Sequence, residues 1–397
     1  MVIFEKIKKA KLRSKAPFSV ILFIMVLVFG TILHSYVSNE QELVESKHRI
    51  LSDIVLKMLG DINETCEFAK SRAMMFASTT LVFSAFRARD RDTLLEQLKP
   101  VYLKQHQKYN VAELHFYDPP AKTFLMLHRE GGYGEDLSSF SKLAVAAAQK
   151  KISQWGVELG RHGAGMKGAA PVLDKDGFIG VIEVSFDFKN IIKKNKTLTS
   201  SEIALLIDTN MFNEICTEVP LKSNIIGAYT YLESSNKDKI LSLIKNCDLS
   251  KNDHKEVFFP KIKKENIGII FYPLHDYEDK VVGKIIVIKS FEDLHVAFYK
   301  KMAWEVIIGI ILIILLVGLV FVAFRALTIY PLLELSKRCL LMVSGKNVSL
   351  KDFAHHHNQL DEITSCLTKL YPELTSNSQH TIEEIKPTDL SDGDLKK

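Results

Sequence analysis

The sequence predicts an α+β protein in which two successive antiparallel β-sheet modules lie behind one long N-terminal helix. Two transmembrane helices and a short cytoplasmic helical segment flank these modules. Three observations support this fold class. Two long apolar runs occupy residues 17–37 and 303–324, residues 38–302 between them mix polar and apolar positions, and a long apolar stripe there precedes many short alternating runs.

The two apolar runs are predicted to cross a membrane. At a rise of 1.5 Å per residue, each is long enough to span a hydrocarbon core of about 30 Å. Six Lys and Arg residues against one Glu in the first fifteen residues indicate that residues 1–16 are cytoplasmic. Two crossings return the C-terminus to the cytoplasm, so residues 38–302 are expected outside the cell inner membrane, in a periplasmic or extracellular position.

A cleaved signal peptide is the alternative interpretation of the first run. That run is long for the apolar region of a signal peptide, and no small-x-small cleavage site follows it. The sequence therefore favours an uncleaved membrane anchor.

Composition excludes several classes of function. The net charge of +5 is modest and much of the excess lies in the N-terminal cluster, so no nucleic-acid surface is expected. No CxxC or CxxCH motif is present, and no cofactor is expected. No catalytic constellation is visible, which argues against an enzyme. Cys216 and Cys247 either form a disulfide or remain buried free thiols.

Residues 38–110 are predicted to form a long stalk helix and a second helix. Apolar residues recur at spacings of seven, four and three, which places them on one helical stripe. The stripe comprises Val44, Leu51, Val55, Met58, Ile62, Cys66, Ala69, Ala73 and Phe76. The first helix is expected to continue to about Ala85, and the second to cover residues 91–109.

Two groups of short strands follow, in residues 111–190 and 191–302. The first group has five strands with period-two patterning and a helix after the second strand, an order typical of a PAS-like half-barrel. Its strands are expected at residues 111–117, 123–129, 153–159, 165–173 and 177–188. The weaker second group is expected at residues 202–208, 229–232, 254–259, 267–273 and 281–289.

Two segments of the first module resemble a known family. Residues 114–140 read LHFYDPPAKTFLMLHREGGYGEDLSSF, and residues 156–188 read GVELGRHGAGMKGAAPVLDKDGFIGVIEVSFDF. Both resemble the double Cache (dCache_3-like) sensor domains of bacterial chemoreceptors and sensor proteins. The resemblance covers about residues 40–190, and in the second module it rests on strand order and the pattern FYPLHDYEDKVVGKIIV. It implies tandem PAS-like (Cache) modules, of which the first is membrane-distal and binds the ligand.

Alternation along the strands predicts which side chains face a ligand. The apolar faces, with Leu114, Leu125 and Ile182 among them, should pack on the long helix. Phe124 is expected on the opposite, polar face, and further residues come from adjoining loops. The predicted ligand-binding residues are His115, Tyr117, Met126, His128, Arg129, Tyr133, Asp136, Trp155, Arg161, Lys167, Glu183 and Asp187.

These residues also have structural interpretations. A polar face of an antiparallel sheet can simply be solvated, and Trp155 can be a packing residue. Arg161 and Lys167 can be surface charges that pair with Glu158 or Glu183. The charge of the ligand stays open, because Arg129, Arg161 and Lys167 would suit a carboxylate. Glu113, Glu183 and Asp187 would instead suit an amine.

A metal site is a weaker alternative. His115 and His128 are expected on neighbouring strands with Glu183 nearby, and two imidazoles with a carboxylate can bind zinc. No local ligand spacing such as HxxxH supports this interpretation. The prediction is therefore a site without metal, occupied by a small polar molecule.

Residues 325–374 resemble a HAMP linker. Pro331 is placed to begin a helix, Gly345 to end it, and the acidic pair Asp361 and Glu362 to open a second helix. The resemblance implies that two helices from each subunit of a homodimer bundle and transmit motion. Pro372 departs from the family pattern, because it falls where the second helix should continue.

Residues 375–397 are polar and turn-rich and are predicted to be disordered. No output domain is recognisable after the HAMP-like segment. The sequence thus predicts a chemoreceptor-like transmembrane sensor that signals to a separate cytoplasmic protein. The alternatives are a membrane-anchored scaffold protein derived from a receptor that has lost its output domain, a truncated gene, or an output carried by a neighbouring gene.

Overall fold

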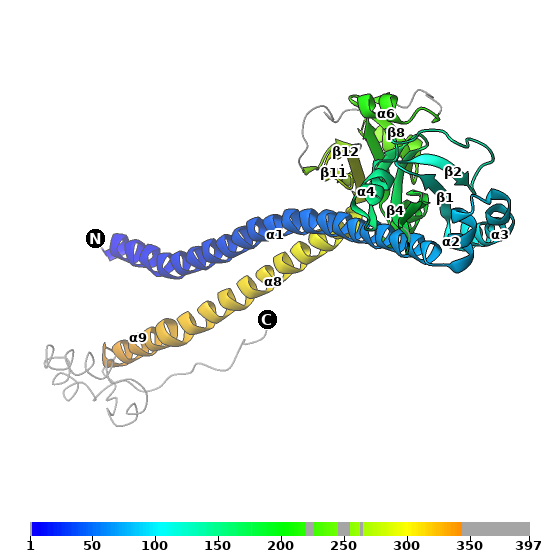
Figure 1. Cartoon of the computed structure of the whole chain (residues 1–397). Coiled ribbons are helices and arrows are strands. Elements are labelled where there is room, and N and C mark those ends of the chain that lie inside the picture. The colour runs from blue at the N-terminus through cyan, green and yellow to red at the C-terminus, as the bar shows by residue number, and fades with distance from the viewer. Residues whose placement is uncertain (1, 176, 220–224, 245–254, 263–264, 344–397) are drawn as a thin grey trace, which may run out of the picture. The chain divides into compact units, whose positions relative to one another are not determined.

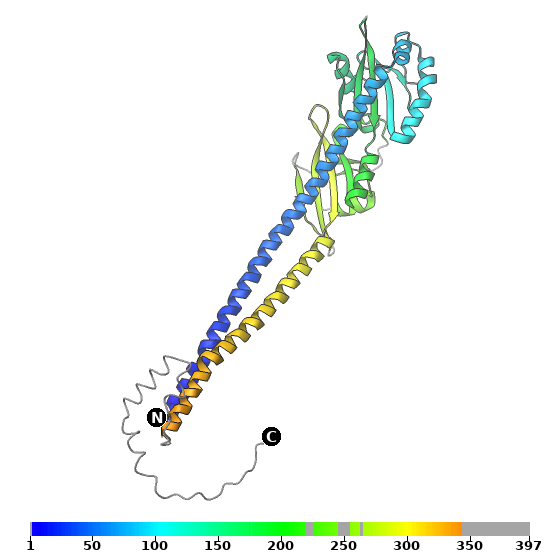
Figure 2. The ribbon, with the colours of Figure 1, turned by 90° about the horizontal axis from the view of Figure 1, so that it is seen from below.

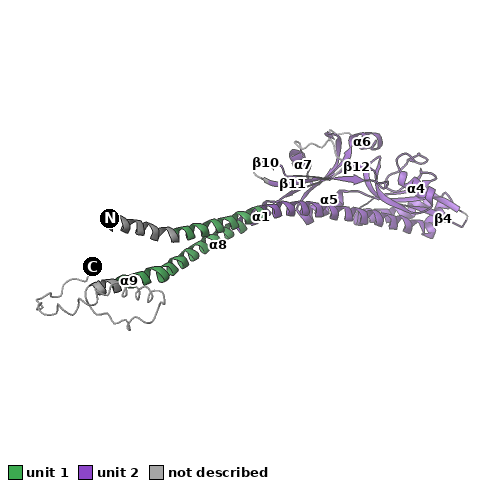
Figure 3. Cartoon of the chain, turned by 90° about the vertical axis from the view of Figure 1, so that its left-hand side faces the viewer, with its two compact units in different colours: residues 1–38, 301–397 green, residues 39–300 purple. Residues whose placement is uncertain are grey.

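The computed structural model describes residues 2–175, 177–219, 225–244, 255–262 and 265–343 (Figure 1). It divides into two units, one of residues 39–300 and one of residues 1–38 with 301–397 (Figure 3). The first of these units contains both sheets and is described first.

Helix α1 (Val2–Ala77) provides the backing of both sheets through residues 39–77, as Figure 2 shows. Its predicted apolar stripe is buried from Leu51 to Phe76, whereas Val44 is exposed. The stripe belongs to one hydrophobic core that also contains the inner faces of both sheets. Burial of that shared surface is the main force that holds the two modules on one helix.

The predicted continuous helix ends earlier than expected. Helix α1 stops at Ala77, and a separate helix α2 (Thr80–Arg87) follows. The hydroxyls of Ser78 and Thr79 donate to the carbonyl of Met75 at 3.1 and 2.8 Å. Side-chain bonds of this kind compete with the helical backbone ladder, and Thr79 adopts an extended conformation at the break.

Helix α3 (Arg91–Tyr109) has the predicted bounds. The carboxylate of Asp90 accepts a hydrogen bond from the backbone N–H of Thr93 at 3.0 Å, so Asp90 caps the helix. Helices α2 and α3 add Phe86 and Leu94 to the core beside the first sheet.

The first module contains the five predicted antiparallel strands, arranged in the order β2-β1-β5-β4-β3. Helix α4 (Lys142–Lys150) follows the second strand, as expected. A small apolar cluster, with Leu143 and Ala147 from α4, packs on the sheet face opposite α1. The strands are β1 (Val111–Asp118), β2 (Lys122–Met126), β3 (Gln154–Gly160), β4 (Gly163–Asp174) and β5 (Gly177–Phe186).

The prediction for Phe124 is wrong. Phe116 pairs with Leu125 and Tyr117 pairs with Thr123, so Phe124 is the extra residue of a β-bulge. A bulge breaks the period-two alternation. Phe124 therefore joins Leu125 in the main core, where its ring lies 4.8 Å from that of Phe86.

The second module has a sheet in the order β10-β11-β12-β6-β8-β7, with β9 paired to β11. All five expected strands are present, and β7 and β10 were not predicted. Its elements are α5 (Lys189–Thr199), β6 (Glu202–Asp208), α6 (Thr209–Ile215), β7 (Ile225–Ile226), β8 (Tyr229–Ser234), α7 (Lys237–Ile244), β9 (Glu256–Phe258), β10 (Lys261–Ile262), β11 (Glu265–His275) and β12 (Val281–Ser290).

The two modules touch at strand β3 and the turn that follows it. The backbone N–H of Tyr277 donates to the carbonyl of Val157 at 2.9 Å, and that of Glu218 donates to Arg161 at 3.0 Å. A Cβ on Gly156 would lie 2.5 Å from the Cβ of Tyr277, so only glycine permits this approach. The second module thus contacts the first close to residues predicted to bind the ligand.

The other unit contains the N-terminal part of α1, helix α8 (Glu292–Phe324) from residue 301 onward, and helix α9 (Tyr330–Val343). Helices α1 and α8 each include a stretch long and apolar enough to cross a membrane. A π-helical turn, η1 (Arg325–Ile329), precedes Pro331. Proline lacks an N–H and crowds the preceding turn, which explains the altered helix there.

Several predictions lie outside the described residues. These are the roles of Gly345, Asp361 and Glu362 and the disorder of residues 375–397. Cys66 and Cys216 are buried free thiols, whereas Cys247 also lies outside the described residues.

Candidate ligand-binding site

A cavity of about 160 Å³ lies on the polar face of the first sheet. An apolar cavity of about 150 Å³ accommodates benzene, so this space suits a ligand of few non-hydrogen atoms. Eight predicted site residues line it: His115, Tyr117, Met126, His128, Arg129, Arg161, Lys167 and Asp187. Glu113 and Ser185, which strand alternation also places on this face, line the cavity too. Lining residues that the sequence did not indicate include Ser141, His162 and Glu218.

Lys167 lies at the buried end of the cavity. Its ammonium contacts the carboxylates of Glu158 at 2.9 Å and Glu183 at 3.2 Å. Burial lowers the pKa of Lys167, but Glu183 and Glu158 together hold that pKa well above its ordinary value. Glu158 also accepts the backbone N–H of Leu143 at 2.7 Å, which ties this charge cluster to helix α4.

Glu183 supports the cavity from behind its lining. Burial raises the pKa of Glu183 to about 7, an effect that Lys167 partly offsets. One oxygen lies 3.4 Å from the hydroxyl of Tyr117, and the other has no hydrogen-bond partner among the described residues. The sequence places this residue on the correct face and allows its pairing with Lys167, but as a pair of surface charges, whereas both side chains are buried.

Two histidines and Tyr117 form one wall. His115 stacks on Tyr117 with 3.8 Å between ring centroids, and its Nε2 lies 3.2 Å from the hydroxyl of Thr123. Burial lowers the pKa of His115 well below its ordinary value, so this ring is neutral. Burial also lowers the pKa of His128, whose Nδ1 has no hydrogen-bond partner within the described part of the chain.

Four charged residues form the entrance, here called the mouth network. Arg129 lies 2.8 Å from Glu218 and 3.4 Å from Glu135. Arg161 lies 2.5 Å from Glu135 and 3.3 Å from Glu218. Glu218 belongs to the second module, where it follows helix α6. The entrance of the cavity is therefore built by both modules.

The positive charges of the cavity have ion-pair partners, whereas two of its negative charges have none among the described residues. Each of the three cations, Lys167 and the two mouth arginines, already contacts two carboxylates. Glu113 and Asp187 also line the cavity, and neither forms an ion pair with another described residue. The surplus charge is negative, so the cavity is electrostatically complementary to a cation.

Comparison with a family model identifies the architecture. Residues 44–295, more than half of the chain, match the family described as the double sensory domain of two-component sensor kinases, dCache_3. The chain belongs to the double Cache family. The match extends over both modules, whereas the resemblance in the sequence is strongest in the first module and rests on strand order and one pattern in the second.

Solved structures similar to this double Cache chain include a periplasmic domain and a sensor domain. The periplasmic domain of LuxQ from Vibrio cholerae is 12% identical, with 60% of this chain and 97% of that chain covered and a TM-score of 0.36. The DctB histidine kinase sensor domain from V. cholerae is 14% identical, with 63% and 98% covered and a TM-score of 0.36.

A third similar structure is the ligand-binding domain of the Campylobacter jejuni chemoreceptor Tlp3 in complex with 4-methylisoleucine. It is 9% identical, with 65% of this chain and 92% of that chain covered and a TM-score of 0.36. The curated proteins include no match to the chain. The family assignment rests on the family model.

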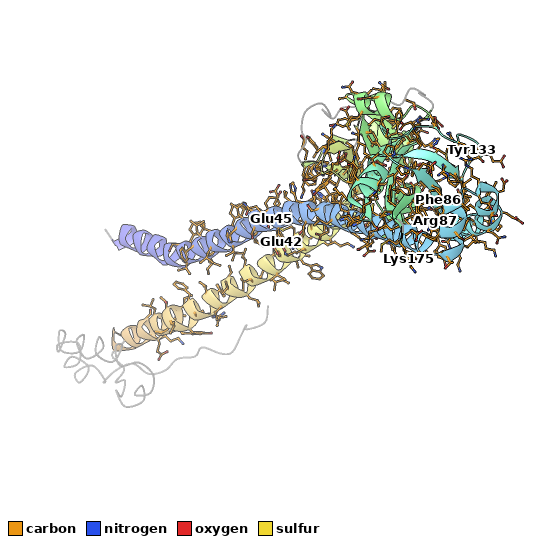
Figure 4. The ribbon with its side chains drawn as sticks, viewed as in Figure 1. Glu42, Glu45, Phe86, Arg87, Tyr133 and Lys175 are labelled. Atoms are coloured by element: carbon orange, nitrogen blue, oxygen red, sulfur yellow. The ribbon has the colours of Figure 1, made fainter. Side chains whose placement is uncertain are left out.

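Three predicted residues lie away from the cavity of the double Cache domain. Tyr133 is half exposed and lies at the surface (Figure 4). The guanidinium of Arg91 lies 5.0 Å from the centroid of its ring. Asp136 accepts hydrogen bonds from Ser138 in its own turn. Trp155 pairs with Gly168 and shares the sheet face toward α1, which agrees with its interpretation as a packing residue.

Two of the three residues considered as zinc ligands are engaged with other partners. His115 faces Thr123, and Glu183 contacts Lys167. A different group gathers at the cavity: Glu113, His128 and His162 each offer a ligand atom, and these atoms lie within 4.8 Å of one another. Strand alternation found His128, but the place of His162 depends on the β3–β4 turn.

Proposed function

We propose that the chain is a transmembrane sensor that binds a small, positively charged ligand in the cavity of its first Cache module. The observation that carries this proposal is a cavity whose cations are already paired, whereas Glu113 and Asp187 form no ion pair with another described residue, although Asp187 Oδ1 accepts the backbone N–H of Lys189. The double Cache family supports a sensory role, since related domains are sensor and ligand-binding modules. We propose no catalytic activity.

Thermal unfolding of the full chain in nanodiscs tests ligand binding. A panel of primary amines, amino acids and divalent metal ions is compared with a panel of simple carboxylates. Ligand at 100 times its dissociation constant stabilises a protein by about 2.7 kcal/mol, which corresponds to a rise of roughly 5–10 °C in the melting temperature. We expect such a rise from at least one cation.

Matched variants locate the binding. Glu113→Gln removes an unpaired carboxylate of the cavity and should abolish the rise. Glu130→Gln removes an exposed carboxylate of the same module that does not line the cavity, and should leave the rise unchanged. No stabilisation by any cation, or equal stabilisation of the Glu113→Gln variant, would contradict the proposal.

We also propose how the signal leaves the domain. The chain would cross the inner membrane twice, in helices α1 and α8, with both termini in the cytoplasm and residues 38–302 outside. A ligand transmits a signal only if it binds one arrangement of the helices more tightly than another. In a homodimer, the HAMP-like segment that begins near Pro331 would pass this change to a separate cytoplasmic protein. The turn η1 supports this route, because it is a break in helical geometry between α8 and α9.

A further inference from the structure

Three metal-ligating side chains from separate parts of the first module meet at the cavity. Glu113 lies on β1, His128 follows the neighbouring strand β2, and His162 occupies the turn between β3 and β4. One ligand atom from each lies within 4.8 Å of the other two. The sheet brings them together, since 49 positions separate Glu113 from His162 in the sequence.

None of the three is held in a strong interaction of its own. Glu113 forms no ion pair with the described residues. The Nδ1 of His128 is buried and lacks a hydrogen-bond partner among them. His162 lies 3.5 Å from Glu218, and its side chain is 46% exposed. A buried, unpartnered imidazole nitrogen is costly, and coordination of an ion would satisfy it.

The three ligand atoms, which lie within 4.8 Å of one another, are spaced more widely than in a site that holds a metal ion, and they can move closer together. Ligand bonds of about 2.0–2.1 Å in a tetrahedral zinc site place ligand atoms roughly 3.4 Å apart. Closure from 4.8 Å therefore requires a movement of little more than 1 Å. The exposed ring of His162 can supply that movement by rotating away from Glu218.

We propose that Glu113, His128 and His162 bind a divalent transition-metal ion in the cavity. This inference rests on the proposed function, because it names the class of cation that the sensor site accepts. Two imidazoles and one carboxylate suit zinc, copper or nickel, whereas calcium and magnesium prefer sites built from oxygen ligands. Three protein ligands leave the fourth tetrahedral position for water or a further ligand group.

Isothermal titration calorimetry of the full chain with zinc chloride, after treatment with a chelator, tests the inference. His355, His356 and His357 are replaced by Asn in every sample, so that this cluster does not add a binding site. We expect one zinc ion per chain at the cavity. His162→Gln and His128→Gln should each weaken binding about 100-fold or more, because loss of a supporting partner alone costs 10–100-fold.

His275→Gln is the matched control, since it removes an exposed imidazole from the second module. It should leave zinc affinity unchanged, and His162→Gln should keep its melting temperature without metal because the side chain is exposed. Absence of zinc binding, or binding that persists in both cavity variants, would overturn the inference. If a metal-free amine still stabilises the chain through Glu113, the sensor proposal stands without the metal.

Discussion

At the scale of single residues, the cavity is organised around buried charge. Lys167 faces both Glu158 and Glu183, and Glu113 adds a further negative charge nearby. Since burial penalises an ionised carboxylate, Glu183 is the group of this cluster whose pKa rises to about 7. A change in its protonation alters the electrostatic field of the cavity near physiological pH.

The variant Glu183→Gln is predicted to gain stability relative to the wild type as pH rises. A carboxyl whose folded pKa is raised from 4.5 to about 7 stabilises the fold fully below pH 4.5, and this contribution is lost as pH passes through 7. Glutamine cannot ionise and keeps its contribution. Melting temperatures of both chains, measured from about pH 5 to pH 8, give the difference.

This comparison cancels the effects of the cavity histidines, because both chains contain them. The pKa of Tyr117, which burial and Glu183 raise, lies above the measured pH range. Glu130→Gln should show no such trend, since Glu130 is exposed. A melting-temperature difference for Glu183→Gln that stays constant, or that falls with rising pH, would show that the fold does not raise the pKa of Glu183.

Residue-level prediction succeeded where strands are regular. Alternation along β1 and β5 correctly assigned His115, Tyr117 and Glu183 to one face. Prediction from alternation failed where the position of a side chain depends on a loop or on a segment far away in the sequence. Tyr133 lies in a glycine-rich turn, and Glu218 meets Arg161 across 57 positions of sequence. No local pattern encodes either placement.

At the scale of elements, close packing between α1 and β4 fixes the sheet on its helix. A Cβ on Gly168 would lie 2.0 Å from the backbone nitrogen of Lys70. The alternating pattern predicted that the apolar sheet face would meet the helix, and the shared core confirms this. The break after Ala77 and the bulge at Phe124 were not predictable, because each depends on competing local hydrogen bonds or on strand pairing.

Gly168→Ala is predicted to destabilise the chain by about 1–3 kcal/mol or more, because the added methyl group must force α1 and β4 apart. Gly60→Ala in the same α1 helix is the control. It has open space around its Cα and should stabilise by about 0.5–1 kcal/mol. Denaturant unfolding measures both, and equal effects of the two substitutions would contradict the close approach of α1 and β4.

At the scale of the whole molecule, the two Cache modules share one hydrophobic core along α1. Ile270 of the second module and Leu114 of the first belong to the same buried cluster. The bond between Tyr277 and Val157 and the mouth network add polar connections near the cavity. A change at the cavity can therefore affect the second module through direct contacts.

Ile270→Ala is predicted to destabilise both modules together. Truncation of a fully buried isoleucine costs about 2–5 kcal/mol. Because the core is shared, amide exchange should accelerate in β4 as well as in β11. Lys193→Ala, at an exposed position, should accelerate neither strand. Acceleration confined to β11 would show that the modules unfold independently.

Hydrogen–deuterium exchange of the full chain in nanodiscs tests the central claim of ligand sensing most directly. The probe is the cation from the thermal panel that raises the melting temperature most. We predict slower exchange in β1, in the segment after β2 and around Arg161, together with a changed rate in residues 325–343. Unchanged exchange around the cavity in the presence of the bound cation would contradict the account.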